Sequence, residues 1–96
     1  MPPSAPVRIP VELRAGARGR WFRLAHAVSV EGLELGAAAP EELDGPVEVA
    51  FHLPGDAEPI RCRARARAEA VHFVQLDEPD GARIERYIQE RLGLIE

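Results

Sequence analysis

Arginine is the residue type in this sequence with the greatest capacity to bind a ligand, because all twelve basic residues are arginines. A guanidinium group presents a planar fork of donors that binds a phosphate, a carboxylate or a guanine edge through two hydrogen bonds. One arginine, Arg8, opens the first apolar segment. Four others alternate with small residues and form one side of a strand: Arg61, Arg63, Arg65 and Arg67. We call these four residues the arginine face.

A second candidate group lies at a turn about twenty residues after Arg8. The Ser29 hydroxyl can donate and accept hydrogen bonds. Gly32 permits either a positive φ or a close approach of the backbone to another group. Separately, the arginines near the N-terminus, Arg8 among them, could form a local basic patch that holds a small anion.

Residues that commonly catalyse reactions or bind metals are scattered along the chain. His26, His52 and His72 fall in separate segments, whereas a metal site needs three or four converging ligands. Cys62 alternates with the arginine face and is expected to point inward as a small apolar side chain. No glycine-rich phosphate loop precedes a helix. We therefore expect no enzyme, no metal site and no cofactor.

Composition indicates one globular domain. The 96 residues are 46% hydrophobic and 29% charged, and the net charge is −4. Basic and acidic stretches alternate along the chain, which disfavours a uniformly basic nucleic-acid binder. Residues 1–6 predict a flexible, proline-stiffened arm without the apolar region of a secretory signal, and residues 7–96 a single domain. The single cysteine favours a reducing, cytoplasmic location.

Hydrophobic periodicity predicts six strands and one helix. The apolar and polar residues alternate with period two in segments of strand length. The expected strands cover 7–13, 21–29, 33–35, 47–53, 60–68 and 71–76, and the expected helix covers about 78–92. Turn signals recur every 8–12 residues and no helix intervenes, so we expect a mainly β, antiparallel barrel or sandwich, with the C-terminal helix packed over it.

Three details of the strands carry further expectations. Pro10 has no backbone N–H to donate to a β-ladder, so we expect the first strand to be an edge strand or Pro10 to lie where a strand begins. The apolar pattern of the last strand shifts phase at Val74, which predicts a bend or bulge. Phe22 is assigned to one side of the second strand together with Leu24, which places Trp21 on the opposite side. An exposed Trp21 would be a binding anchor, and a buried one would cover the barrel end.

The order of these features resembles a PilZ domain, the bacterial receptor module for cyclic di-GMP, over nearly the whole chain. The most specific parts are Arg8-Ile9-Pro10-Val11, Ser29-Val30-Glu31-Gly32-Leu33 and the segment from Phe73 to Ile88. The resemblance implies a six-stranded antiparallel PilZ-like β-barrel with one C-terminal α-helix.

The family signature consists of RxxxR on the arm and [D/N]xSxxG at the strand turn. Arg8, Ser29 and Gly32 match it, and the resemblance implies that these residues would bind cyclic di-GMP. Ser4 replaces the first arginine, and Ala27 replaces the acid or amide. Both departures remove groups that would bind the nucleotide.

The resemblance therefore leads to a bacterial signalling or motility adaptor that acts by protein–protein contact, with weak or no cyclic di-GMP binding. Family members that act without the nucleotide take part in type IV pilus assembly and surface motility. The candidate contact residues are Trp21 and the arginine face. One alternative is a cyclic di-GMP receptor that uses Arg8, Ser29 and Gly32 with another arginine such as Arg14 or Arg23. A remote alternative is a small nucleic-acid-binding barrel.

The arginine face also has a simpler interpretation. A barrel needs a solvated outer surface, and arginines there would pair with Glu48 or Glu58 on neighbouring strands. No aromatic residues alternate with these arginines, so stacking platforms for single-stranded nucleic acid are absent from this face.

Overall fold

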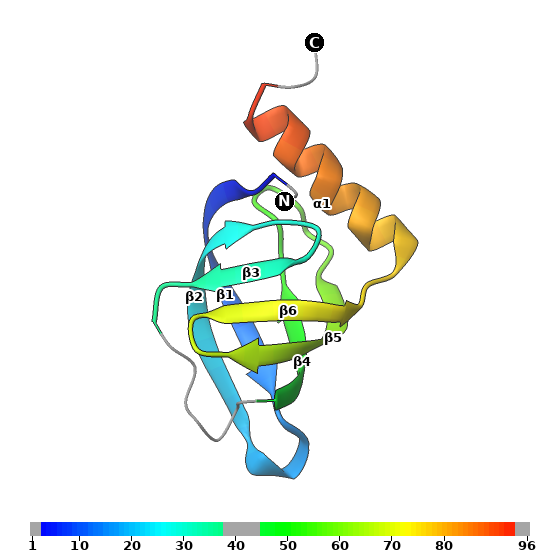
Figure 1. Ribbon diagram of the computed structural model, residues 1–96. Coiled ribbons are helices and arrows are strands. Elements are labelled where there is room, and N and C mark those ends of the chain that lie inside the picture. Colours follow the sequence, from blue (N-terminus) through cyan, green and yellow to red (C-terminus); the bar gives the residue numbers. More distant parts are fainter. Residues whose placement is uncertain (1–2, 38–44, 94–96) are drawn as a thin grey trace.

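Six antiparallel strands close into a barrel in the order β1-β2-β3-β6-β5-β4 (Figure 1). The computed structural model describes residues 3–37 and 45–93. Its elements, in chain order, are β1 (Ala5–Arg14), the 3-10 turn η1 (Gly16–Arg18), β2 (Arg20–Val28), β3 (Gly32–Leu35), β4 (Gly45–Phe51), β5 (Ile60–Arg67), β6 (Ala70–Gln75) and α1 (Glu78–Arg91). The predicted barrel with one C-terminal helix is confirmed.

The N-terminal segment enters the barrel earlier than the sequence suggested. β1 begins at Ala5, and Ala5 is fully buried opposite Val28 of β2. Two residues of the expected arm, Ala5 and Pro6, therefore belong to the strand. Residues 1–2 of that arm and residues 38–44 of the long loop lie outside the described residues.

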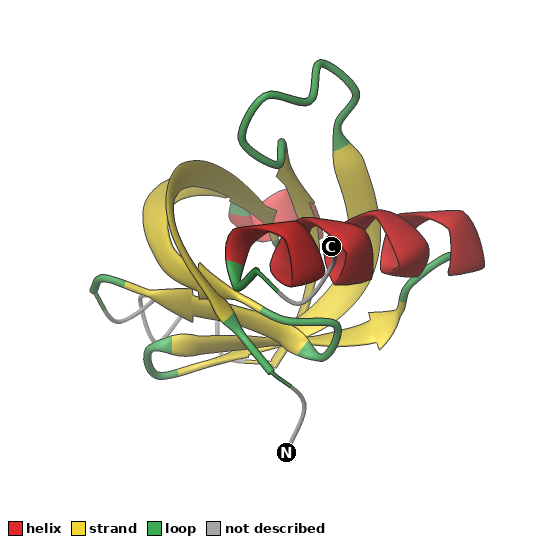
Figure 2. Cartoon of the chain, turned by 90° about the horizontal axis from the view of Figure 1, so that it is seen from above, coloured by secondary structure: helices red, strands yellow, loops and turns green. Residues whose placement is uncertain are grey.

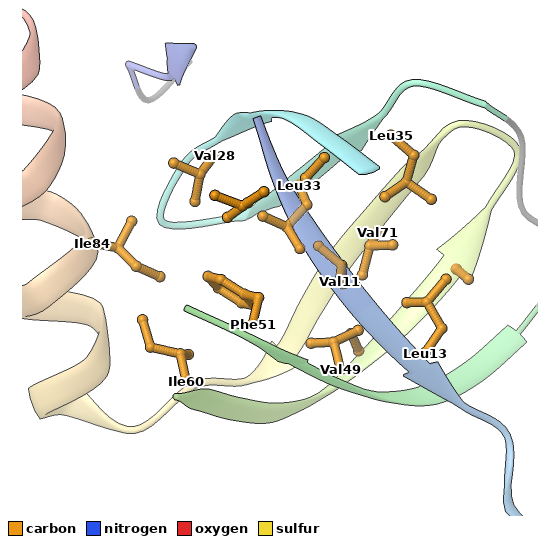
Figure 3. Packing of buried hydrophobic residues seen from close by; sticks show 14 of the residues in the cluster. Val11, Leu13, Val28, Leu33, Leu35, Val49, Phe51, Ile60, Val71 and Ile84 are labelled. Atoms are coloured by element: carbon orange, nitrogen blue, oxygen red, sulfur yellow. The ribbon is translucent and has the colours of Figure 1, made fainter. Parts of the chain in front are cut away.

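The barrel interior is filled by the inward-facing residues of all six strands (Figure 3). Alternate positions of β1, β4 and β5 are buried, as period two requires. Phe51 lies at the centre, and its ring stacks on that of Phe73 with centroids 6.0 Å apart. The largest fully buried side chains are Phe51, Leu13, Ile60, Ile84, Ile88, Val11, Val28, Val49 and Val71.

Register shifts change the direction of side chains in β2 and β6. In β6 the pairing moves from Ala64–Phe73 to Arg63–Gln75, so Val74 has no direct partner, and its side chain is 63% exposed. The bulge predicted at Val74 is confirmed. In β2 a similar shift falls between Ala25 and Ala27.

The bulge in β2 makes the predicted orientation of its aromatic residues wrong. Val28 points inward. Because β2 has one extra residue between Ala25 and Ala27, the alternation of inward and outward side chains is reversed in the part of β2 before this bulge. Trp21 therefore lies opposite the buried Leu13 and packs half-buried against the core, whereas Phe22 is 59% exposed. The guanidinium of Arg20 lies 5.8 Å from the centroid of the Phe22 ring.

The expectation of an edge strand at Pro10 is corrected in part. β1 pairs with β2 along its length but with β4 only from Val11 to Arg14. Pro10 lies just before the second ladder begins, where β1 is paired on one side only. The missing N–H is therefore tolerated in a strand whose second half is paired on both sides.

The helix α1 lies across one end of the barrel, as the view from above shows (Figure 2). Its buried residues are Ile84 and Ile88, one turn apart, and Ile84 points toward Phe51 and Ile60 (Figure 3). Pro79 occupies the first turn, where its missing N–H leaves no helical hydrogen bond unmade. Asp77 is the N-cap residue but makes no side-chain capping bond.

An ion-pair cluster fastens the start of α1 to the loop between β4 and β5. One guanidinium nitrogen of Arg83 lies 2.6 Å from the Asp56 carboxylate and donates to the Glu58 carbonyl at 2.7 Å. The other terminal nitrogen donates to Asp80 at 2.9 Å. Asp56 also accepts from the Glu58 backbone N–H at 3.0 Å, and both interactions hold the pKa of Asp56 below its usual value. The carboxylates raise the pKa of Arg83.

Replacing Ile84 by alanine tests how far the barrel depends on this helix. We expect Ile84→Ala to reduce the free energy of unfolding by about 2–5 kcal/mol and Ile84→Val by about 0.5–1.5 kcal/mol, because both remove buried methyl groups. Urea unfolding followed by circular dichroism measures the change. The exposed neighbour Glu85→Ala is the control, and an equal loss there would contradict the packing account.

The Asp56 ion pair predicts an acid-sensitive contribution to stability. Because the folded-state pKa of Asp56 lies below the unfolded value near 3.8, the contribution is present above that pH and disappears as the pH falls through the folded pKa. The melting temperatures of wild type and Asp56→Asn should therefore differ at pH 6 and converge toward pH 3. A constant difference over this range would contradict the assignment.

Candidate functional site

The turn between β2 and β3 holds Ser29 by its own hydrogen bonds. The Ser29 N–H donates to the Gly32 carbonyl at 2.9 Å, and the Glu31 N–H donates to the Ser29 hydroxyl oxygen at 3.2 Å. This is a local turn in which serine caps the backbone two residues ahead. The Ser29 side chain therefore already has a structural role.

Gly32 also has a structural role, since it allows two strands to approach closely. It is buried in β3 opposite His72 of β6, and a Cβ atom at this position would collide with the carbonyl oxygen of Val71. Gly32 is not among the glycines with positive φ. Close approach, rather than an unusual φ, explains the glycine.

The barrel brings four of the five signature positions to one shallow pocket. Ser4, Ala27, Ser29 and Gly32 all line a hollow of about 180 Å³ between the N-terminal segment, the β2–β3 turn and β6. We call it the turn pocket. Arg8 does not line it; it is exposed on β1, at the register shift between Pro6 and Ile9. Ser29 and Gly32 therefore share one hollow with Ser4 and Ala27, and Arg8 is not among the residues that line it.

The charge of the turn pocket does not suit an anion. Its ionisable lining residues are Glu31, Glu34 and His72, and the lining includes no arginine. Two carboxylates beside a phosphate would repel it, and no guanidinium offsets them. The described lining of the turn pocket therefore offers no guanidinium donor to a negatively charged ligand.

The arginine face lies on the outside of the barrel, as predicted. Arg61, Arg63, Arg65 and Arg67 are all exposed on β5. None of the four side chains forms an ion pair or a hydrogen bond with another residue in the described parts of the chain. The expected pairing with Glu48 or Glu58 is therefore not observed, although Glu48 lies directly opposite Arg63.

Arg63 belongs to a row of outward-facing polar residues that crosses four strands. Arg14 of β1 pairs with Glu48 of β4, Glu48 with Arg63 of β5, and Arg63 with Gln75 of β6. Residues directly opposite one another in adjacent strands point to the same face. The closure of the barrel thus places Arg14 beside the arginine face, which the sequence did not predict.

Two adjoining hollows follow this row, with volumes of about 340 and 550 Å³. They share Arg14, Glu48 and Arg63, and we call them together the basic groove. The charged residues lining the groove are five arginines and two carboxylates: Arg14, Arg18, Arg61, Arg63, Arg65, Glu48 and Asp77. The exposed Val74 contributes an apolar side chain. Sequence reasoning missed Val74 here, although the phase shift at that residue was the available signal.

Cys62 lines the same groove but is not a reactive nucleophile. It lies opposite the buried Val49 and is half-buried. Burial, with smaller contributions from Asp80 and Asp77, raises the pKa of its thiol to about 11. The thiol is protonated at neutral pH, whereas the thiolate is the nucleophilic form.

The described residues, 3–37 and 45–93, contain neither a metal-binding cluster nor a membrane-spanning helix. No group of three or more histidine, cysteine, aspartate or glutamate residues there could hold a metal ion. No helix in this part of the chain is long and apolar enough to cross a membrane.

The fold is that of PilZ domains. No family model and no curated protein matches the sequence. Among solved structures, the PilZ domain of CeSA from a cellulose-synthesizing bacterium superposes with a TM-score of 0.63 at 21% identity, covering 96% of this chain and 97% of that one. MotI/DgrA, an inhibitor of motility from Bacillus subtilis, superposes with a TM-score of 0.73 at 12% identity, covering 97% of this chain. The chain spans 51% of the MotI/DgrA chain.

The structural role of Gly32 gives a test that needs no ligand. Gly32→Ala should lower the free energy of unfolding by about 1–3 kcal/mol or more, because β3 and β6 must move apart. Gly81→Ala in α1 is the matched control: its Cβ would lie 3.7 Å from Leu76, an ordinary contact, so it should stabilise by about 0.5–1 kcal/mol. Urea unfolding compares the two, and an unchanged stability for Gly32→Ala would contradict the close approach.

Proposed function

We propose that this chain is a PilZ-type regulatory module that acts by contact with a partner protein and does not depend on cyclic di-GMP. The observation that carries the proposal is the turn pocket. Ser4 and Ala27 stand in it where the family signature has an arginine and an acid or amide, and Glu31 and Glu34 give it negative charge. Non-catalytic action in the bacterial cytoplasm, in signalling or in motility or pilus machinery, belongs to the same proposal.

The binding free energy lost with the two missing signature groups favours protein contact over nucleotide binding. A hydrogen bond to a charged group contributes about 1.5–3 kcal/mol, so two missing charged contacts cost roughly 3–6 kcal/mol. At about 1.4 kcal/mol per tenfold change, the loss amounts to roughly two to four decades in Kd. A site of micromolar affinity would thereby become too weak to respond to a signalling nucleotide.

The likeness to an inhibitor of motility supports a regulatory role in general terms. MotI/DgrA shares the fold at 12% identity, and its name states that it inhibits motility. Regulation of motility is therefore one part of our proposal for this chain. A small barrel without clustered metal-binding residues in its described parts suits such a role, since regulation by contact needs only a surface.

The competing candidate is a cyclic di-GMP receptor, and one observation favours it. Ser29 and Gly32 do line a common pocket, as the family signature requires. A receptor would need Arg8 to reach that pocket and a second arginine to replace Ser4. Binding measurements separate the two candidates.

Isothermal titration with cyclic di-GMP at physiological salt tests the proposal. The wild-type chain should give no saturable heat at micromolar concentrations. The double variant Ser4→Arg/Ala27→Asp, which restores the signature, should gain binding of roughly micromolar affinity. Removing Arg8 from that variant by Arg8→Ala should abolish the gain. Saturable micromolar binding by the wild type would overturn the proposal in favour of the receptor.

A further inference from the structure

The basic groove has the features of a recognition surface rather than those of an ordinary solvated face. Surface arginines usually lie beside carboxylates, and the chain has sixteen acidic residues available for this purpose. Yet Arg14, Arg61, Arg63 and Arg65 form no ion pair among the described residues, where the carboxylates that line the same hollows are Glu48 and Asp77. The guanidinium donors of these four arginines have no acceptor in this part of the chain and can bind an external one.

An apolar side chain stands among these arginines. The bulge in β6 leaves Val74 without a cross-strand partner and 63% exposed, and Val74 lines the groove together with Pro46 and Ala64. Protein interfaces combine an apolar centre with polar surroundings, and arginine is enriched in them. The groove therefore offers an apolar contact as well as charge.

We propose that the basic groove binds an acidic segment of a partner protein, with carboxylates on Arg14, Arg63 and Arg65 and an apolar side chain on Val74. This inference rests on the proposed function, since it names the surface and the chemistry through which contact occurs. Carboxylates match the guanidinium fork by two parallel hydrogen bonds. The hollows of about 340 and 550 Å³ provide space for several side chains of such a segment.

The groove suits a protein segment better than a nucleic acid. The Glu48 carboxylate lies between Arg14 and Arg63, where it would repel a continuous phosphate backbone but tolerate a mixed peptide. No aromatic side chain lines either hollow, so bases would have no platform for stacking.

Fluorescence polarisation with defined probes tests the inference at 150 mM NaCl. The probe is a fluorescein-labelled ten-residue peptide in which glutamates alternate with leucine, valine and glutamine. Its comparison probes are the same peptide with every glutamate changed to glutamine, a labelled single-stranded DNA and vesicles with one quarter phosphatidylglycerol. We expect saturable binding of the acidic peptide, and weaker binding of the other three.

Charge-matched variants assign the binding to the groove. Arg63→Glu should weaken binding of the acidic peptide at least tenfold, and Val74→Ser about threefold. Arg91→Glu, which makes the same charge change at the exposed last residue of α1, should alter it less than twofold. Unchanged melting temperatures establish that each variant is folded. Absence of peptide binding, equal losses from Arg63→Glu and Arg91→Glu, or tighter binding of DNA or vesicles would each overturn the inference.

These outcomes remain distinct from those for the proposed function. If the groove fails these tests while cyclic di-GMP still gives no heat, the partner contacts another surface and the proposed function stands. If the wild type binds cyclic di-GMP while the acidic peptide binds the groove, the nucleotide-independent function fails and the groove stands.

Discussion

Closure of the barrel through the four-residue strand β3 is the constraint on which the rest of the structure depends. β3 must pair with β2 on one side and with β6 on the other. Gly32 permits the close approach to Val71, and the Phe73 N–H donates to the Glu31 carbonyl at 2.8 Å where the β3–β6 ladder begins. Because the strands enclose little more than the space that their inward side chains fill, the interior is apolar, and no charged residue among those described is buried.

The separation of apolar side chains inside the barrel from charged side chains outside it explains both the basic groove and the turn pocket. On β5 the inward positions are small or apolar, which leaves the intervening arginines outside. The ladders then align Arg14, Glu48, Arg63 and Gln75, which come from four strands far apart in the sequence. The same closure brings Ser4 and Ala27 to the turn that holds Ser29. The turn pocket therefore gathers four of the five signature positions, with Ser4 and Ala27 in place of an arginine and an acid or amide.

The sequence predicted the strands because the alternation of apolar and polar residues along β1, β4 and β5 is regular. The predicted orientation of Trp21 and Phe22 was wrong because a bulge lies between those residues and Val28. A simple alternation of inward and outward side chains takes no account of a bulged residue that has no partner on the neighbouring strand. The sequence indicated Ser29 and Gly32 as a pair but not their structural roles, which depend on the Glu31 N–H and on Val71. It could not place Arg14 or Val74 beside the arginine face, since strand order determines that contact.

The separation of charge has a consequence for how the molecule meets other molecules. Glu31 and Glu34 lie at β3, whereas the arginines of the basic groove lie two strands away on β5 and at the end of β1. A small body with opposite charges on different sides has a dipole moment even when its net charge is −4. In the field of a charged neighbour it rotates before contact, so that long-range forces select the orientation of approach and raise the association rate in dilute salt. Dissociation depends instead on short-range contacts.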